Sequence, residues 1–274
     1  MLPAQTRTHR QPAEPEQPRR RIAFRRKRAM DYFTEKELVA QTGHGVAEWP
    51  LVAVKELVDN AIDGSEDVNV PPEIEVEVQA DRIRVADNGP GLPAALIDEI
   101  LDFSIFISTR DGYIGPTRGA QGNALKTLVA MPFVLGASPG RIDVRACGVR
   151  HEIEVGVDLV RQEPKVEVAR QPEAGEGTEV TVWWPPSSAS SLIGQSERIL
   201  QILRGYTFLN PHLRITYRIF EDAATIEPTD RAWTRRKWTP ADGASPHWFD
   251  LAAFRRFVAG HVVYDEDHGQ HRLV

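Results

Sequence analysis

The sequence has almost no cysteine and no long apolar run, and both absences narrow the class of protein. Cys147 is the single cysteine among 274 residues, which excludes an internal disulfide and a cluster of metal-binding thiolates. No stretch approaches about 18 uncharged apolar residues, and residues 1–21 lack the apolar core of a secretory signal. We therefore expect a cytoplasmic protein with no membrane partner.

The charge is distributed unevenly along the chain. The net charge is -6, yet residues 1–30 hold nine of the 33 Lys and Arg and two of the 39 acids, a local charge of +7. Because Pro3, Pro12, Pro15 and Pro18 oppose regular structure, we expect a disordered basic arm over residues 1–29. Such an arm is a candidate contact for DNA through counterion release. A solvated tail is the alternative, and the two are compatible because such arms often order on binding.

Hydrophobic periodicity predicts one α/β domain over residues 30–220, in a chain with 41% hydrophobic and 26% charged residues. The clearest helix runs from Trp49 to about Ser65, with an apolar stripe that includes Val54, Leu57 and Ile62. Further helices are predicted at 31–43, 92–101, 124–131 (stopped by Pro132) and 188–206, and strands at 73–78, 83–87, 141–148, 150–158, 165–170, 178–185 and 213–220. Since the hairpins imply antiparallel pairing, we expect a two-layer sandwich, a mixed and mostly antiparallel sheet covered by helices.

Two segments lack this periodicity. Residues 103–123 contain four glycines and form a long predicted loop, which inside a domain is usually functional. Residues 221–274 are predicted to be a C-terminal extension, mostly loop, with one amphipathic helix at 249–260.

The segment KELVDNAID places polar residues on the strongest helix. Glu56, Asp59, Asn60 and Asp63 fall at helical spacing on one face, opposite the apolar stripe. Three acids repel one another, and asparagine is a mediocre helix former, so a cation such as hydrated Mg²⁺ would explain the pattern. A solvated acidic face is the alternative.

Two glycine-rich segments add further candidates. VADNGPGL follows a strand, so Gly89 and Gly91 allow a tight turn, and Asp87 can accept a hydrogen bond from an exocyclic amine. TRGAQGNALK precedes a helix, where backbone N–H groups can face phosphates, although the spacing is not that of a Walker A loop. Each segment alone also fits a plain turn or loop.

The order of these segments, followed by GTEVTV, resembles the GHKL ATPase superfamily, which includes gyrase B, MutL, the large heat-shock chaperone and the histidine kinases on the Bergerat fold. ELVDNAID, DNGPGL, TRGAQGNALK and FLNPHLRITY are most similar to the ATPase portion of the B subunit of DNA topoisomerase VI. The resemblance covers roughly residues 30–220.

The resemblance implies a role for each matching residue. Glu56 would be the general base, Asn60 the Mg²⁺ ligand, and Asp87 the residue that reads adenine, supported through water by Thr178. The other implied nucleotide-binding residues are Gly89, Gly91, the phosphate-side pair Ser108 and Thr109, and the phosphate loop with its helix start, Gly119, Ala120, Gln121, Gly122, Asn123, Ala124, Leu125 and Lys126.

The chain departs from the family pattern in two places. Ala124 stands where the family has a third loop glycine, which favours a slightly earlier helix start because alanine disfavours positive φ. The family's transducer domain carries a lysine that reaches the γ-phosphate, and only about 54 residues follow position 220. We therefore expect that lysine to be absent, to come from a partner, or to be missing because the chain is truncated.

The resemblance also implies a function. It indicates an ATP hydrolase with ATP and Mg²⁺ as cofactors, acting in DNA processing as an ATP-dependent homodimer with a DNA-cleaving partner. The alternative is a nucleotide-gated interaction module with little turnover. Histidine-kinase phosphotransfer is disfavoured, since no pair of helices with a phosphoacceptor histidine precedes Glu56.

Overall fold

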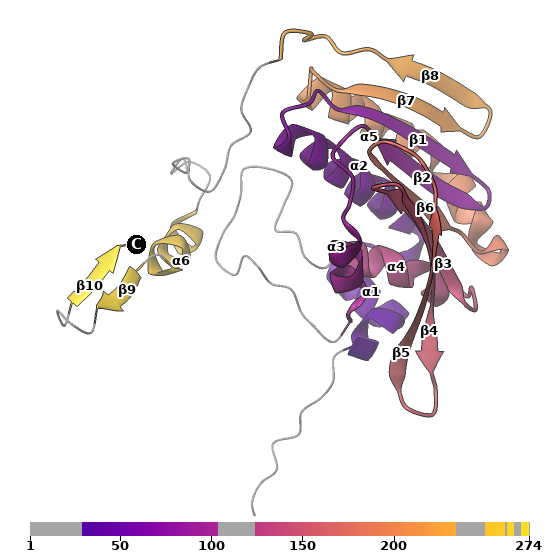
Figure 1. Cartoon of the computed structure of the whole chain (residues 1–274), viewed down its shortest axis with the longest axis horizontal. Coiled ribbons are helices and arrows are strands. Elements are labelled where there is room, and N and C mark those ends of the chain that lie inside the picture. Colours follow the sequence, from indigo (N-terminus) through magenta and orange to yellow (C-terminus); the bar gives the residue numbers. More distant parts are fainter. Residues whose placement is uncertain (1–28, 104–123, 234–249, 261, 266–269, 274) are drawn as a thin grey trace, which may run out of the picture.

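The computed structural model describes residues 29–103, 124–233, 250–260, 262–265 and 270–273 (Figure 1). The main strands are β1 Glu73–Gln79, β2 Arg82–Asp87, β3 Gly140–Ala146, β4 Val149–Asp158, β5 Glu163–Pro172, β6 Thr178–Trp183, β7 Arg214–Ile219 and β8 Asp222–Ile226. They form one sheet in the order β5-β4-β3-β6-β2-β1-β7-β8. Within this sheet β1 pairs with β7 in parallel, and the other neighbours pair antiparallel.

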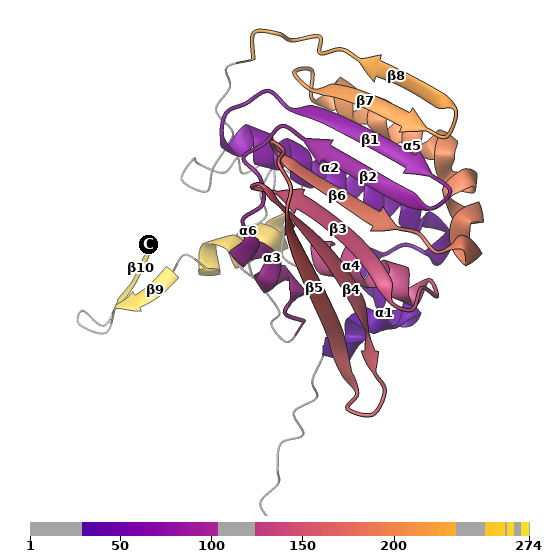
Figure 2. The same ribbon diagram turned by 45° about the vertical axis from the view of Figure 1, so that its right-hand side comes forward.

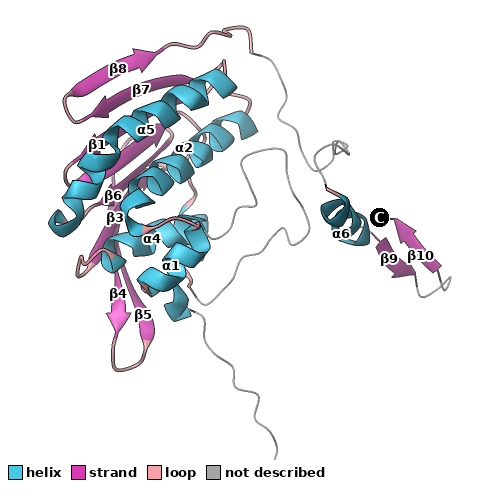
Figure 3. Cartoon of the chain, turned by 180° about the vertical axis from the view of Figure 1, so that it is seen from behind, coloured by secondary structure: helices cyan, strands magenta, loops and turns pink. Residues whose placement is uncertain are grey.

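Helices cover one face of this sheet. They are α1 Glu35–Thr42, α2 Trp49–Asp67, α3 Ala94–Leu101, α4 Ala124–Val134 and α5 Ala189–Leu209, with short 3₁₀ segments η1 Ala29–Phe33, η2 Val46–Glu48 and η3 Pro186–Ser188. Figure 3 shows α5, α2, α4 and α1 in front of the strands, whereas Figure 2 shows the strands in front and α2, α4 and α5 behind. The predicted two-layer α/β sandwich with a mixed, mostly antiparallel sheet is confirmed.

The core lies between the two layers. The alternation in β1 and β2 buries residues such as Val78 and Ile83 completely, and α2 contributes Val58 and Ile62 from its apolar stripe. On the uncovered face, alternate positions carry charge, as in the ion pair between Arg84 and Glu179. Burying one face of each strand while solvating the other accounts for the period of two in the sequence.

The structure differs from the predicted elements in three places. Helix α4 continues past Pro132 and ends two residues later at Val134. A proline this close to the helix end removes a single backbone hydrogen bond, while Met131 stays buried in the core. Strand β8 and a small hairpin of β9 Val262–Asp265 and β10 Gln270–Leu273 are present although the sequence pattern did not predict them. The predicted C-terminal helix is present as α6 Leu251–Gly260.

The described chain stays attached to the sheet domain beyond residue 220. After β8, the backbone N–H groups of Thr229 and Asp230 donate to the Pro211 carbonyl, and the Trp233 ring stacks on His212. The predicted basic arm and glycine-rich loop lie outside the described residues, apart from Phe103 and Ala29 at their edges. No helix among the described residues combines the length and the apolar character needed to cross a membrane.

Candidate nucleotide-binding site

Glu56 and Asn60 lie one turn apart on α2, where the polar segment was predicted. The Glu56 side chain is 23% exposed, and its Oε1 accepts a hydrogen bond from Lys55 Nζ at 3.2 Å. The Asn60 amide has a buried Nδ2 that finds no hydrogen-bond partner among the described residues. Because rotation of an amide exchanges its nitrogen and oxygen, that position can present either a donor or a metal-binding oxygen. A buried polar atom that lacks a partner is what a ligand contact would satisfy.

Asp59 does not share the open face on which the helical spacing placed it. Its carboxylate is only 4% exposed, and it accepts hydrogen bonds from Tyr206 Oη at 2.6 Å and Lys55 Nζ at 2.8 Å. Tyr206 comes from α5, which packs along this side of α2. The polar face predicted for Glu56, Asp59, Asn60 and Asp63 is therefore split, with Asp59 turned into the interface between the two helices.

Asp87 ends β2, and its carboxylate is held by two backbone amides. Oδ1 accepts hydrogen bonds from the N–H of Gly89 at 2.8 Å and the N–H of Thr178 at 3.1 Å. Burial raises the pKa of Asp87, although both hydrogen bonds act to lower it. Since both bonds go to Oδ1, Oδ2 is the atom available to a ligand among the described contacts. The backbone amide of Thr178 thus binds Asp87 directly. A water-mediated contact between the Thr178 side chain and Asp87 stays a prediction.

A glycine at position 177 is required by the close approach of β6 to Asp87. Gly177 has a φ of 68°, and a Cβ built there would lie 1.8 Å from the Asp87 carbonyl oxygen. Gly91 has a φ of 84°, and its Cβ would lie 2.8 Å from Cys147 Sγ at the hairpin between β3 and β4. Residues far apart in the sequence thus form a tight wall around Asp87.

Asn88, which the sequence analysis did not single out, holds the Asp87 turn in place. Its Oδ1 accepts hydrogen bonds from Ser65 Oγ at 3.2 Å and the N–H of Glu73 at 2.9 Å. Its Nδ2 donates to the Pro71 carbonyl at 3.0 Å. The side chain therefore ties the turn to the end of α2 and to the segment that leads into β1. The D-N-G turn in the sequence could have pointed to Asn88, but the residues that Asn88 binds lie far from the turn in the sequence, so their identity could not be predicted.

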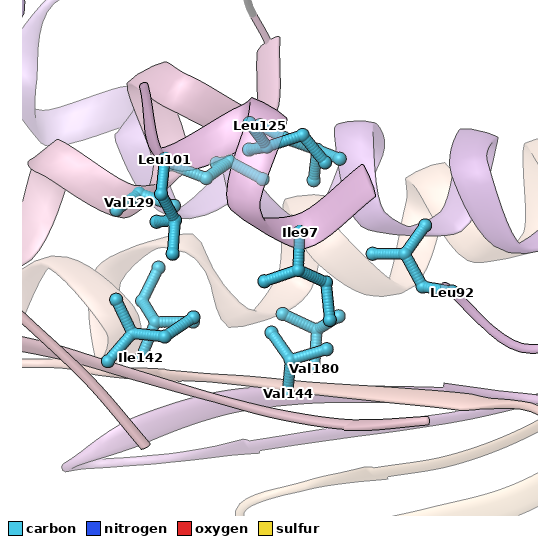
Figure 4. Close-up of a pocket in the computed structure, with 11 residues that line it drawn as sticks. Leu92, Ile97, Leu101, Leu125, Val129, Ile142, Val144 and Val180 are labelled. Carbon is cyan, nitrogen blue, oxygen red and sulfur yellow. The ribbon is translucent and has the colours of Figure 1, made fainter. Parts of the chain in front are cut away.

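An apolar cavity adjoins this turn between α3, α4 and the sheet (Figure 4). Its volume is about 30 Å³, close to that of one water molecule. Leu92 follows Gly91 in the turn, and Val180 lies two residues after Thr178 on β6. The other lining residues are Ile97, Ile100, Leu101, Leu125, Leu128, Val129, Ile142, Val144 and Ile153. The cavity is therefore lined by apolar side chains, two of which, Leu92 and Val180, belong to the segments that carry the Asp87 turn and Thr178.

The predicted phosphate-side residues are described only in part. Ser108, Thr109, Gly119, Ala120, Gln121, Gly122 and Asn123 lie outside the described residues, as does the side chain of Ala124. Lys126 is fully buried, and its Nζ donates to the Asp102 carbonyl at 2.6 Å. Burial lowers the pKa of Lys126, against the opposing charges of Asp102 and Glu99. A contact between Lys126 and phosphate stays a prediction.

Geometry and electrostatics together define a class of site. The half-buried Asp87 carboxylate, with one oxygen held by backbone amides, suits a base that donates a hydrogen bond. A partly exposed glutamate near an unsatisfied amide suits a hydrated phosphate–metal group. In the described part of the chain, no cluster of three or more His, Cys, Asp or Glu could hold a metal alone.

Residues 45–188 match the family model of the histidine kinase-, DNA gyrase B- and HSP90-like ATPases. The match covers more than half of the chain, and the chain belongs to this family. Its membership, together with the eight-stranded sheet covered by helices, confirms the resemblance that the motifs indicated.

The curated relatives share one name. The chain is 25% identical over 185 residues to the B subunit of type 2 DNA topoisomerase 6 from Natronomonas pharaonis, a match that covers 65% of this chain and 22% of that protein. It is 30% identical over 132 residues to the same protein from Halobacterium salinarum, covering 46% and 16%. The matches thus span about a fifth or less of the length of these two relatives.

Solved structures of two ATPase domains also match. One is the ATPase domain of the mismatch repair endonuclease MutL of Aquifex aeolicus, with a TM-score of 0.40, 20% identity, and coverage of 65% of this chain and 60% of that chain. The other is the ATP binding domain of topoisomerase IV of Francisella tularensis, with a TM-score of 0.41, 16% identity, and coverage of 65% and 86%.

Proposed function

We propose that this chain binds ATP with Mg²⁺ and hydrolyses it, as the ATPase part of a DNA-processing enzyme similar to topoisomerase VI. The observation that carries the proposal is the Asp87 carboxylate, which is half-buried at the start of the DNGPGL turn. One of its oxygens is committed to two backbone amides, while the other faces no protein donor among the described contacts. That arrangement suits a ligand that donates a hydrogen bond.

Asp87 would select the base. Its Oδ2 would accept a hydrogen bond from the exocyclic amine of adenine, which guanine lacks at the corresponding position. Leu92 and Val180, which line the apolar cavity, would pack on the base. The glycines of the turn permit the close backbone approach that such packing needs.

Glu56 would act as the general base at the phosphate end. Its partly exposed carboxylate would accept a proton from the attacking water, and the phosphate loop amides predicted at 119–126 would bind the phosphate oxygens. Asn60 would hold Mg²⁺ through its amide oxygen. When bound, the ion neutralises charge on the phosphates.

A role in DNA processing is supported by the shared name of the relatives. Each is named as part of a DNA topoisomerase, and we propose that this chain also works with a DNA-cleaving partner and dimerises when ATP binds. The basic arm over residues 1–29 would supply a sequence-independent contact with DNA.

A nucleotide-gated interaction module is the second candidate. Lys126, the lysine beside the predicted phosphate loop, directs its ammonium to the Asp102 carbonyl. If no other cation reaches the γ-phosphate, nucleotide would bind and change a partner surface while turnover stayed low.

Calorimetric titration with ATP, with and without Mg²⁺, combined with a phosphate-release assay, separates these candidates. Glu56→Gln should keep ATP affinity and reduce turnover by roughly 10²–10⁴, the usual worth of a general base. Asn60→Ala should lose the Mg²⁺-dependent part of binding. Glu35→Gln, at an exposed acid on α1, is the matched control and should behave as wild type. Binding without turnover in wild type favours the interaction module, and absence of ATP binding contradicts both candidates.

A further inference from the structure

Three side chains connect α5 to the carboxylate of Glu56. Tyr206 Oη donates to Asp59 Oδ1 at 2.6 Å, and Lys55 Nζ donates to Asp59 Oδ2 at 2.8 Å. The same ammonium donates to Glu56 Oε1 at 3.2 Å. The two oxygens of Asp59 thus serve different partners, and Lys55 bridges the two acids. This series of hydrogen bonds begins on α5 and ends at the proposed general base on α2.

Asp59 is the most buried residue in this series of hydrogen bonds, so its side chain is the most restricted in position. Its side chain is 4% exposed, compared with 50% for Lys55 and 23% for Glu56. A buried carboxylate needs hydrogen bonds, and each Asp59 oxygen has at least one. Lysine is a flexible four-carbon chain, so Lys55 would sample many rotamers if Asp59 did not hold its ammonium. The position of that ammonium beside Glu56 therefore depends on Asp59.

The charge of Lys55 suits a role next to a general base. Burial lowers the pKa of Lys55, but the hydrogen bond to Asp59 and the charges of Glu56 and Asp59 outweigh it and raise the pKa. The ammonium therefore stays charged at neutral pH. An ammonium held at 3.2 Å from Glu56 Oε1 restricts the rotamers of that carboxylate through their hydrogen bond.

We propose that Tyr206, Asp59 and Lys55 are positioning residues for Glu56, and that α5 thereby sets the orientation of the general base. The inference rests on the proposed function, because it assigns these residues to the hydrolysis that Glu56 would carry out. The three residues act through the Glu56 carboxylate and need no contact with the nucleotide or the attacking water.

Tyr206→Phe tests the proposal because it removes one hydroxyl and keeps the ring between α2 and α5. We expect unchanged ATP affinity and a kcat that falls between about threefold and a hundredfold, the upper figure being what a misplacement of about 1 Å can cost. Lys55→Met should lower kcat similarly, and Lys55→Arg should retain most of it. Arg198→Met is the matched control, since it removes a hydrogen bond from α5 to Glu48 at 3.0 Å and should leave kcat unchanged.

A double-mutant cycle with Glu56→Gln distinguishes positioning from general loss of structure. If Tyr206 acts through Glu56, Tyr206→Phe should not reduce the residual turnover of Glu56→Gln any further. An equal fold-reduction in both backgrounds, or a Tyr206→Phe variant with the wild-type kcat, would overturn the inference alone. If Glu56→Gln hydrolyses ATP like wild type, or wild type does not hydrolyse it, the proposed function fails and the inference fails with it.

Discussion

The Asp87 carboxylate and the Thr178 backbone amide lie 3.1 Å apart, although 91 positions separate them in the sequence. The contact joins the end of β2 to the start of β6, which are neighbours in the sheet. It fixes one oxygen of Asp87 and so orients the other. Because the donor is a backbone N–H, its placement depends on Gly177, the residue just before it.

Gly177→Ala should destabilise the fold and abolish nucleotide binding. The new methyl group would lie 1.8 Å from the Asp87 carbonyl oxygen, so the backbone must move. Gly148→Ala is the matched control, since Gly148 also has positive φ (76°) but has open space around it. We expect Gly148→Ala to cost about 1–2 kcal/mol by urea unfolding, the penalty of the left-handed backbone alone. Gly177→Ala should lower the free energy of unfolding clearly more than Gly148→Ala does. Equal losses would contradict the close approach of Gly177 to the Asp87 carbonyl.

Asp87→Asn should remove adenine recognition and leave the fold intact. The amide oxygen can still accept from the N–H groups of Gly89 and Thr178, but the amide NH2 group, a donor, then faces the ligand where a carboxylate oxygen stood. We expect ATP affinity to fall by on the order of 1–3 kcal/mol, the cost of an unpaired buried group. Wild type should prefer ATP to GTP in the same titrations. Equal affinity for the two nucleotides would argue against Asp87 as the base-reading residue.

Asp87 should also make the stability of the nucleotide-free protein depend on pH. Burial raises its pKa above the ordinary value of 3.8, so folding favours the protonated form. This contribution is complete below pH 3.8 and is lost as the pH rises through the folded pKa. Relative to wild type, Asp87→Asn should therefore gain stability as the pH is raised from about 4, then level off. Urea unfolding across this range measures the difference, and a constant difference would contradict the raised pKa.

His212→Ala should destabilise the protein much more than His44→Ala, although both histidines face a glutamate. The buried pair joins His212 Nε2 to Glu66 Oε1 at 2.9 Å, with side chains only 8% and 9% exposed, and Trp233 stacks on the His212 ring. We expect a loss of about 1–3 kcal/mol there, because a buried carboxylate loses this hydrogen bond. His44 pairs with Glu48 on the surface, where the loss should stay within about 1 kcal/mol. Thermal unfolding compares the two.

Deleting residues 2–29 should weaken DNA binding and flatten its salt dependence. The first 30 residues hold nine Lys and Arg, and log K falls by roughly 0.9 for each phosphate neutralised on duplex DNA. Fluorescence anisotropy at several salt concentrations gives the slope for both chains. ATP affinity should not change. A slope that is the same in both chains would mean that the arm is only a solvated tail.

The elements that the sequence predicted correctly are those whose burial pattern is local. Helix α2 shows its apolar stripe within 19 residues, and the strands that alternate bury one face against the helices. Strand β8 escaped prediction because it is an edge strand with four exposed residues out of five, so no hydrophobic period marks it. Helix α4 continues past Pro132 while Met131 is buried in the core, and the sequence alone does not show that burial.

The sequence by itself determined the family, the order of the motifs and the helix on which Glu56 and Asn60 lie, because residue spacing places side chains on a helix face without knowledge of the rest of the chain. Only the tertiary structure decided which of those polar residues remain open to a ligand. Tyr206, 147 positions away in the sequence, binds the Asp59 carboxylate and keeps it away from a ligand. The backbone amide of Thr178, 91 positions away, orients the Asp87 carboxylate. Helical period does not encode which element packs alongside, so contacts between distant segments become visible only when the sheet and its helices come together.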